Sequence, residues 1–275
     1  MFDLPAYLAR VQLPTRVTDD AAGLHRLQRA HRLAIPFENL DVALGRAIAV
    51  DSAGVFAKLV TARRGGYCFE HNRLFGDALA ALGFVARPLS AQVLLSGTPT
   101  PPGTHALSLV TIDRQDWIAD AGFGGSYSPP MPLSDGAEAS APDGARFRLE
   151  AADGGWALLR DGDPGTTDGR GGGAGWRPQY RFTTAAVDDA AIAAGNRWAS
   201  TDPASRFVQH RIVSIVLPRG FARLTDRHYR RQVGSEVGEG EITDPRVYRL
   251  RLSLMFGIDL TAAEVGALEL WPSAP

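Results

Sequence analysis

The hydrophobic pattern of this chain changes its period near Phe84. Up to that point apolar residues recur every three or four positions, as between Phe75 and Leu82, which indicates a helix that Gly83 ends. Beyond it, short apolar runs are separated by Pro, Gly and Asp turns, which is typical of antiparallel strands. Helices followed by strands, with a mixed C-terminal part, predict an α+β fold.

Four segments of the central part resemble strands: FVARPLSAQVLL at 84–95, HALSLVTI at 105–112, DWIADAGF at 116–123 and RFRLEAADGGWALLR at 146–160. They predict an antiparallel barrel or a meander. Residues 161–175, DGDPGTTDGRGGGAG, are too rich in glycine and charge to bury a side chain. We interpret them as a loop without chemistry.

The C-terminal part begins with a helical stretch around residues 185–199. RIVSIVL at 211–217 and VYRLRLSLMF at 247–256 look like strands, and the capping box T-A-A-E at Thr261–Glu264 predicts a short last helix. We therefore divide the chain into a helical part at 1–85, a β part at 86–185, and a linker helix with an α/β part at 186–275.

Charge and cysteine content exclude several classes of function. Lys and Arg total 29 against 30 Asp and Glu, so no basic field favours nucleic acid or an anionic membrane. The opening residues MFDLPAYLARVQLP do not resemble a signal peptide, and we expect a cytoplasmic protein. One cysteine cannot form an internal disulfide or a zinc site of several cysteines, so we expect no metal.

The single cysteine, Cys68, lies in RRGGYCFEHN at 63–72, near the start of a predicted helix. A thiol with a pKa of about 8.5 is mostly protonated at neutral pH and needs help to become a nucleophile. A helix N-terminus, Arg63, Arg64 and a histidine brought near by folding could each supply that help. The competing interpretation is a small apolar side chain in the core, but the Gly pair and the polar residues around Cys68 favour the nucleophile.

The histidines differ in how well they could serve Cys68. His71 is three residues away on the same helix, a spacing that controls a thiol–imidazole hydrogen bond poorly. Four others lie in polar contexts where we expect solvated rings: His25, His31, His210 and His228.

His105 opens a strand, and Asp120 ends the next strand-like run after the turn Asp113–Asp116. The two should be neighbours in a hairpin, where a carboxylate fixes the imidazole tautomer. Cys68, His105 and Asp120 form a candidate nucleophile–base–orienter triad, although an Asp near a turn can also merely cap backbone groups. GFGGS at 122–126 could form an anion nest, but a plain β-turn is the simpler interpretation.

Several of these segments together resemble the arylamine N-acetyltransferases. The similarity rests on IPFENLDV at 35–42, RRGGYCFEHN at 63–72, Thr104–His105 before a strand, and DAGFGGSY at 120–127. Weaker matches are TDPASRF at 201–207 and FGIDL at 256–260. The matches span most of the chain in the order typical of the family.

The resemblance implies an N-terminal helical bundle, a central antiparallel β-barrel and a C-terminal α/β lid, with a papain-like Cys-His-Asp triad. It also implies a ping-pong reaction. Cys68 would take an acetyl group from acetyl-coenzyme A and pass it to an arylamine, arylhydrazine or N-hydroxyarylamine, with His105 relaying protons and Asp120 orienting the ring.

Further site residues follow from the same resemblance. The apolar acceptor pocket would contain Phe37, Val93 and Phe123. An ion pair of Arg64 with Glu38 would support the cysteine loop, the alternative being ordinary surface charge. Coenzyme A would contact Gly103, Thr104, Gly124, Ser126 and Ser205; Ala204 and Arg206 stand where the family often has hydroxyl residues.

Three other functions are compatible with the same residues. A related amide synthase would use Cys68 on a carrier-bound thioester, a thiol hydrolase would use water in place of the amine, and a non-enzymatic module would only bind a coenzyme or partner. The sequence carries no signal for an oligomeric state.

Overall fold

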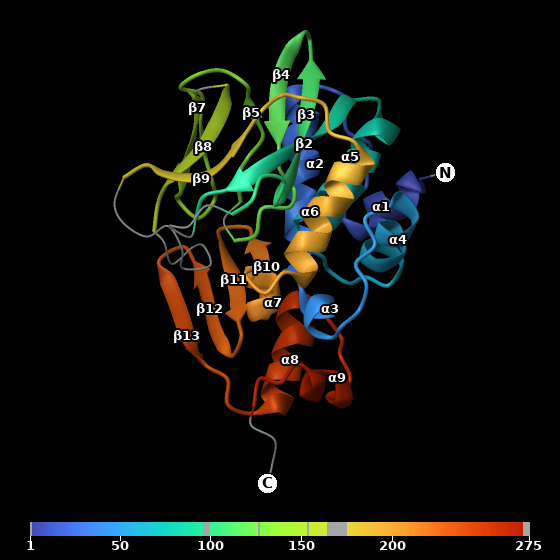
Figure 1. The fold of residues 1–275 in the computed structure, drawn as a ribbon, viewed down its shortest axis with the longest axis vertical. Helices are drawn as coiled ribbons and strands as arrows, with labels where there is room; N and C mark the ends of the chain where they lie inside the picture. The colour runs from blue at the N-terminus through green and yellow to red at the C-terminus, as the bar shows by residue number, and fades with distance from the viewer. Residues whose placement is uncertain (1, 96–99, 126, 153, 164–174, 272–275) are drawn as a thin grey trace.

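The computed structural model describes residues 2–95, 100–125, 127–152, 154–163 and 175–271 (Figure 1). Short helices make up the N-terminal part: α1 Leu4–Arg10, α2 Ala21–Ala34, α3 Leu40–Ala43, α4 Ser52–Phe56, the π-helical turn η1 Ala57–Thr61, and α5 Cys68–Leu82. The apolar faces of α1, α2, α4, η1 and α5 share one core with the first barrel strands, whereas Leu40 of α3 packs in the core of the C-terminal part. Most of the loop predicted at 161–175 and the Ser126 position lie outside the described residues.

Helix α5 is capped at both ends. At the N-terminus the Glu70 carboxylate accepts a hydrogen bond from the Tyr67 amide, 3.0 Å away, which satisfies one of the amides that a helix start leaves without a partner. At the C-terminus Gly83 adopts the left-handed conformation with φ 99°. The predictions that Gly83 ends this helix and that Cys68 lies at its start are both confirmed.

The central part is an eight-stranded antiparallel sheet in the order β5-β4-β3-β2-β9-β8-β7-β6, which curves into a nearly closed barrel. Its strands are β2 Val85–Val93, β3 His105–Ile112, β4 Gln115–Ala119, β5 Met131–Pro132, β6 Glu138–Ser140, β7 Arg146–Ala152, β8 Gly155–Asp161 and β9 Arg177–Phe182. Of the two topologies that the sequence allowed, the barrel is therefore confirmed over the meander.

The β3–β4 hairpin turns through two residues, Asp113 and Arg114, which have positive φ angles of 50° and 66°. Ile112 consequently pairs with Gln115, and Ser108 with Ala119. A turn with positive φ at both positions matches the twist of the flanking strands. This register brings the end of β4 alongside the first half of β3.

A second sheet of five strands, in the order β1-β10-β11-β12-β13, forms the C-terminal part. The sheet consists of β1 Phe37–Glu38, β10 Ile212–Leu217, β11 Gly220–Thr225, β12 His228–Val233 and β13 Glu236–Glu241. The helices of the C-terminal part are α6 Asp189–Thr201, α7 Arg206–Gln209, α8 Pro245–Phe256 and α9 Ala262–Ala267. Because β1 comes from the N-terminal part, the first and last parts of the chain interlock. In Figure 1 this sheet and α8 lie below the barrel.

The strand predicted at 247–256 is wrong, because this segment is helix α8. Asp244 caps its start, Pro245 is its first residue and Gly257 ends it with φ 64°. The buried residues Tyr248, Leu252 and Phe256 recur every four positions, so the period is helical. The capping box of Thr261 with Glu264, by contrast, is confirmed at the start of α9.

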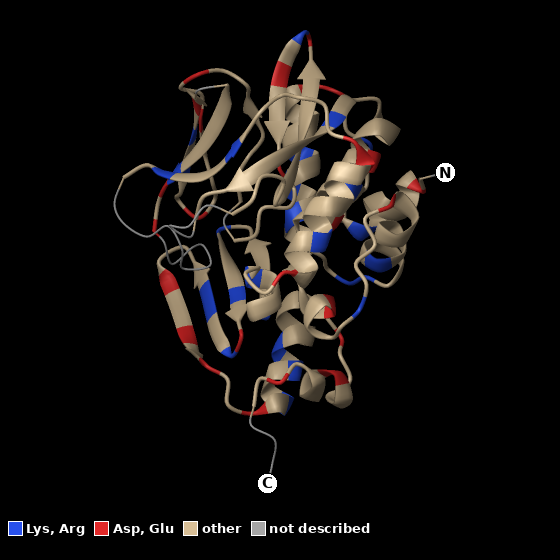
Figure 2. Ribbon diagram, viewed as in Figure 1, with Lys and Arg blue, Asp and Glu red and all other residues tan. Residues whose placement is uncertain are grey.

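Charges of both signs are scattered over the helices and both sheets (Figure 2). In the part of the chain that the structure describes, no helix combines the length and the apolar character needed to cross a bilayer.

Candidate active site

Cys68 is the first residue of α5 and is buried, with 3% of its surface exposed. The loop before it is held against β1. The Glu38 amide donates to the Gly66 carbonyl at 2.8 Å, and a Cβ atom on Gly65 would lie 2.3 Å from the Pro36 carbonyl oxygen. Gly65 is therefore required because the two backbone segments approach too closely to leave room for a side chain.

His105 and Asp120 are neighbours, as the hairpin predicts. His105 Nε2 and Asp120 Oδ2 are 2.7 Å apart, and both side chains are buried. Cys68 and His105 line the same cavity, and the Cys68 side chain is close enough to help raise the pKa of His105. Because Asp120 occupies Nε2, Nδ1 is the nitrogen left for the sulfur, so the fold brings the three predicted residues together in a line.

The electrostatics of this line favour a protonated His105. Burial lowers the pKa of the ring, but the Asp120 carboxylate and the contact with Cys68 outweigh it and raise the pKa to about 10. Burial also disfavours the charged form of Asp120 and so raises the pKa of its carboxyl group. Interactions with His105, the Gly122 amide and Asn72 outweigh burial and hold that pKa below its ordinary value. The arrangement therefore supports an imidazolium beside an ionised carboxylate.

Asn72, which the sequence analysis did not select, holds β3 and the segment after β4 to α5. Its Nδ2 donates to the Ala106 carbonyl at 2.6 Å and to Asp120 Oδ1 at 3.2 Å, and its Oδ1 accepts from the Ala121 amide at 3.1 Å. It is one turn of helix after Cys68, so one helix positions both Cys68 and Asp120.

Two further buried residues confine the segment after Asp120. Arg32 donates to the carbonyls of Ala121, Phe123 and Gly125. Tyr180 packs against both His105 and Phe123, with ring centroids 5.1 Å apart in each case. Neither residue lies in a recognisable motif; only the fold brings them to the site.

A cavity opens beside Cys68 and His105, and the predicted acceptor residues Phe37, Val93 and Phe123 all line it. One side of its wall comes from the C-terminal part of the chain. Phe207, Ile212, Ser214, Arg223 and Thr225 belong to this wall and were missed. The sequence offered little signal for them, because their contribution depends on how the second sheet docks.

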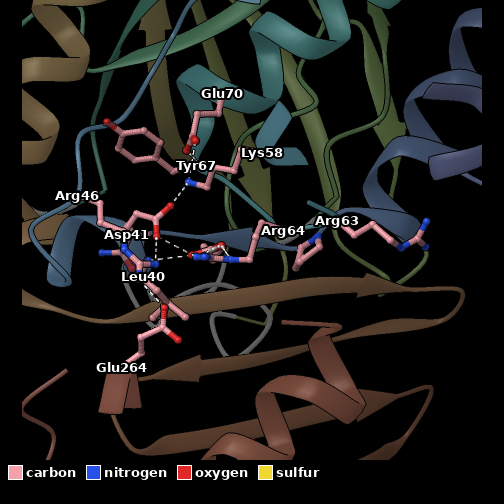
Figure 3. A network of polar contacts seen from close by, with 12 residues as sticks. Leu40, Asp41, Arg46, Lys58, Arg63, Arg64, Tyr67, Glu70 and Glu264 are labelled. Carbon is pink, nitrogen blue, oxygen red and sulfur yellow. Dashed lines mark hydrogen bonds and ion pairs between the residues drawn. The ribbon is translucent and has the colours of Figure 1, made fainter. Parts of the chain in front are cut away.

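The predicted pair of Arg64 and Glu38 is part of a larger buried network (Figure 3). Arg64 Nη2 is 2.7 Å from Glu38 Oε1, whose carboxylate is fully buried, and 3.2 Å from Asp41. Glu38 Oε2 also accepts from the Leu40 amide at 3.0 Å. Burial rules out the interpretation of this pair as ordinary surface charge.

Lys58 extends the network to the helix of Cys68. Its Nζ lies 2.8 Å from Asp41 and 2.7 Å from Glu70, the residue that caps α5 (Figure 3). Burial raises the pKa of Glu70 to about 7 even though Lys58 opposes the shift. Lys58 comes from the π-helical turn η1, an irregularity that the sequence pattern did not indicate.

Two of the residues predicted to contact coenzyme A belong to the cavity wall. Thr104 and Gly124 line it. Gly103 adopts φ 81° in the preceding turn. Ser205 caps α7 and donates to the Ala199 carbonyl at 2.5 Å, so its hydroxyl proton is already used within the chain.

Two of the remaining histidines are buried and hydrogen-bonded to each other. His31 is fully buried, so its prediction as a solvated ring is wrong. His71 is also fully buried and turns both ring nitrogens away from Cys68, toward His31 and the Pro36 carbonyl. Within the described residues, no group of three or more His, Cys, Asp or Glu side chains could hold a metal ion.

Comparison with known proteins gives consistent matches along the chain. The family model described as N-acetyltransferase matches residues 20–265. The chain is 35% identical over 272 residues to the arylamine N-acetyltransferase / N-hydroxyarylamine O-acetyltransferase of Salmonella typhimurium, covering 97% of this chain and 92% of the relative. The solved structure of the Salmonella typhimurium arylamine N-acetyltransferase superposes with a TM-score of 0.89 at 33% identity and 98% coverage of both chains.

Two other relatives bear on substrates. The Mycobacterium marinum arylamine N-acetyltransferase, solved in complex with CoA, has a TM-score of 0.84 at 29% identity and 97% coverage of both chains. Proansamycin X synthase of Amycolatopsis mediterranei is 34% identical over 191 residues, which cover 67% of this chain and 68% of the relative.

Proposed function

This chain belongs to the arylamine N-acetyltransferase family and is an acyltransferase dependent on acetyl-coenzyme A; we propose that it works by a ping-pong reaction through Cys68. The observation that carries the proposal is the line of Cys68, His105 and Asp120 beside an apolar cavity. In this proposal Cys68 is the nucleophile, His105 the acid and base, and Asp120 the orienting carboxylate.

In the first half-reaction the Cys68 thiol gives its proton to His105, and the thiolate attacks the thioester carbonyl carbon of acetyl-coenzyme A. The new carbon–sulfur bond forms a tetrahedral intermediate, the bond to the coenzyme A sulfur breaks, and His105 returns the proton to the leaving thiolate. One thioester replaces another, so the step is close to balanced in energy.

In the second half-reaction the amine nitrogen of the acceptor attacks the acetyl-Cys68 carbonyl. The nitrogen loses a proton to His105, the carbon–sulfur bond breaks, and Cys68 leaves as a thiolate beside the imidazolium. The raised pKa of His105, about 10, keeps that cation available at neutral pH. A flat aromatic amine or hydrazine suits the cavity wall of Phe37, Val93 and Phe123.

The proposal also includes a cytoplasmic location and a set of residues that contact coenzyme A. These residues are Gly103, Thr104, Gly124, Ser126 and Ser205. Thr104 and Gly124 are supported by their place on the cavity wall. Ser205 has the weaker support, because its hydroxyl serves α7 and the Ala199 carbonyl.

The test is mass spectrometry of the protein after incubation with acetyl-coenzyme A alone. We expect one acetyl group on Cys68, which an added arylamine removes as the acetylated amine. Cys68→Ala and Cys68→Ser should take no acetyl group while keeping the circular dichroism spectrum of the unaltered protein. Turnover by either variant would refute the nucleophile. Acetylation of Cys68 itself releases one equivalent of coenzyme A thiol per protein, so continued release beyond that equivalent without the amine would favour a thiol hydrolase.

A second candidate is an amide synthase acting on a carrier-bound thioester, favoured by the similarity to proansamycin X synthase. The same Cys68 chemistry would serve a larger acyl group. Turnover with acetyl-coenzyme A and a simple arylhydrazine would decide against it, whereas failure with both and acylation by a longer thioester would support it.

A further inference from the structure

Three side chains that the proposed reaction does not use form a continuous buried chain of hydrogen bonds. Tyr7 Oη lies 3.0 Å from His31 Nδ1, His31 Nε2 lies 2.9 Å from His71 Nδ1, and His71 Nε2 lies 3.1 Å from the Pro36 carbonyl oxygen. Tyr7, His31 and His71 are all fully buried. The chain therefore runs from α1 through α2 and α5 to the residue before β1.

The direction of this chain follows from its last member. A carbonyl oxygen can only accept, so His71 Nε2 carries the hydrogen. The Nδ1 of that neutral ring then accepts, which requires His31 Nε2 to donate, and His31 Nδ1 in turn accepts from the Tyr7 hydroxyl. Each donor has one acceptor and no buried ring nitrogen is left without a partner.

Both imidazoles must be neutral for this pattern to hold. A proton on His71 Nδ1 would face the hydrogen on His31 Nε2, and a proton on His31 Nδ1 would reverse the bond so that the Tyr7 hydroxyl accepts. Their surroundings enforce neutrality. Burial, followed by the nearby Arg32 charge, lowers the pKa of His71 to about 3. Burial, His71 and the two cations Arg32 and Arg10 lower the pKa of His31 well below its ordinary value.

The Pro36 carbonyl is a junction between the cysteine loop and the acceptor cavity. It lies 3.4 Å from the Gly66 amide as well as 3.1 Å from His71. The next residue, Phe37, lines the cavity, and its ring is nearly parallel to that of His71, at 11° with centroids 6.3 Å apart. His71 thus holds Phe37 twice, through the preceding carbonyl and through its ring.

We propose that Tyr7, His31 and His71 form a directed relay of hydrogen bonds that fixes Phe37, which makes His71 a positioning residue for the aromatic acceptor. The inference rests on the proposed function, because it takes the cavity as the acceptor site. The relay is static: a carbonyl has no proton to pass on, so it cannot feed Cys68 with protons. His71 therefore acts on acceptor binding rather than on acetylation of Cys68.

The first test is ring-nitrogen NMR of the full chain labelled with nitrogen-15 histidine. We expect His31 and His71 to be neutral with the hydrogen on Nε2, and to stay so from about pH 6 to about pH 8. A ring that titrates in this range, or a hydrogen on Nδ1, overturns the relay whatever the enzyme kinetics show.

The second test separates the two half-reactions in His71→Leu. The milder Tyr7→Phe serves as a second variant and His228→Gln, at an exposed histidine, as the control. In His71→Leu we expect the KM for an arylamine to rise about fivefold or more, as the loss of a buried hydrogen bond predicts. Single-turnover acetylation of Cys68 should change less than about twofold. Tyr7→Phe should shift KM in the same direction by less.

An unchanged KM in His71→Leu, or an equal loss in both half-reactions, contradicts the positioning role. If His71→Leu does not fold, the KM of Tyr7→Phe decides the same question, and an unchanged value there refutes the relay. Failure of the unaltered protein to acetylate Cys68 would instead refute the proposed function, and the NMR result would still decide whether the relay exists.

Discussion

Asp120 uses both of its carboxylate oxygens, and this division sets its role. Oδ2 contacts His105 at 2.7 Å, while Oδ1 accepts from the amides of Gly122 and Phe123 at 3.0 and 2.9 Å and from Asn72. The hydrogen bonds to Oδ1 fix the orientation of the carboxylate, and the carboxylate in turn fixes the orientation of the His105 ring. At the scale of single residues, orientation of His105 thus depends on a side chain that is itself held at several points.

Asp120→Asn tests this dependence. An amide can keep the shape but would present either a donor or a weaker acceptor to His105, so the ring loses the tautomer and charge that it needs. We expect kcat/KM for acetyl transfer to fall by about a thousandfold or more, with the protein still folded. Stopped-flow measurement of Cys68 acetylation checks this; a loss below about tenfold would leave Asp120 a structural cap only.

The sequence was sufficient to select the candidate triad from residue type and spacing. It was not sufficient to find the residues that contribute to the site by packing. Cys68, His105 and Asp120 could be selected because a lone cysteine, a strand start and a hairpin register point to them. Arg32 could not, because its three carbonyl partners lie about ninety positions further along the chain. His31 was placed on the surface because its neighbours are polar, yet its side of α2 faces the core.

The contact between α5 and the segment after Asp120 holds the site together at the scale of elements. Gly122 lies directly on the start of α5: a Cβ atom there would be 2.5 Å from Asn72 Nδ2 and 2.7 Å from the Cys68 carbonyl oxygen. Real Cβ atoms do not approach backbone so closely, so a side chain at this position must push the two elements apart.

Gly122→Ala should therefore reduce both stability and activity. Overpacking of this kind costs about 1–3 kcal/mol of unfolding free energy, and displacement of Asp120 from His105 should lower kcat at least about tenfold. The matched control is Gly76→Ala within α5, where a Cβ meets nothing within 4 Å. That change should stabilise the protein by about 0.5–1 kcal/mol and keep kcat. Denaturant unfolding and steady-state kinetics give both numbers, and a harmless Gly122→Ala would contradict the close contact.

Elements were predicted well where period and caps agreed. Strand β3 has the predicted bounds 105–112, and α5 ends at the predicted glycine. The prediction for residues 247–256 was wrong because apolar residues alternate with Arg between Tyr248 and Leu252, a pattern typical of a strand. The residues that α8 buries are instead spaced four apart, which is the helical period. Asp244, Pro245 and Gly257 carried the correct signal at its ends.

The whole molecule places the site where its parts meet. Cys68 comes from the helical part, His105 and Asp120 from the barrel, and the far cavity wall from β10 and β11. Pairing of β1 with β10 ties the first part to the last, Phe37 opposite Ser214. The division at residues 85 and 185 stays a prediction, and this interlocking argues that the parts depend on one another for stability.

The buried pair of His105 and Asp120 should make the stability of the whole molecule depend on pH. The pKa of His105 is about 10 in the folded protein against an ordinary 6.5. A group whose pKa is raised on folding contributes stability that is fully present below about pH 6.5 and is lost as the pH rises through about 10. The buried pair with Asp120 should thus make the unfolding free energy decline between neutral and alkaline pH.

His105→Gln isolates this contribution, because a neutral amide cannot bind the proton. We expect the unfolding free energy of this variant, measured by denaturant titration at about pH 6, 8 and 10 with tryptophan fluorescence, to decline less steeply than that of the unaltered protein. The control variant His228→Gln, at an exposed ring, should follow the curve of the unaltered protein. Other groups titrate in the same range in all three proteins, so only the difference in slope reports His105. Equal slopes for His105→Gln and the unaltered protein would mean that the folded state does not hold the His105 proton above neutral pH, and the imidazolium of the proposed reaction would lose its basis.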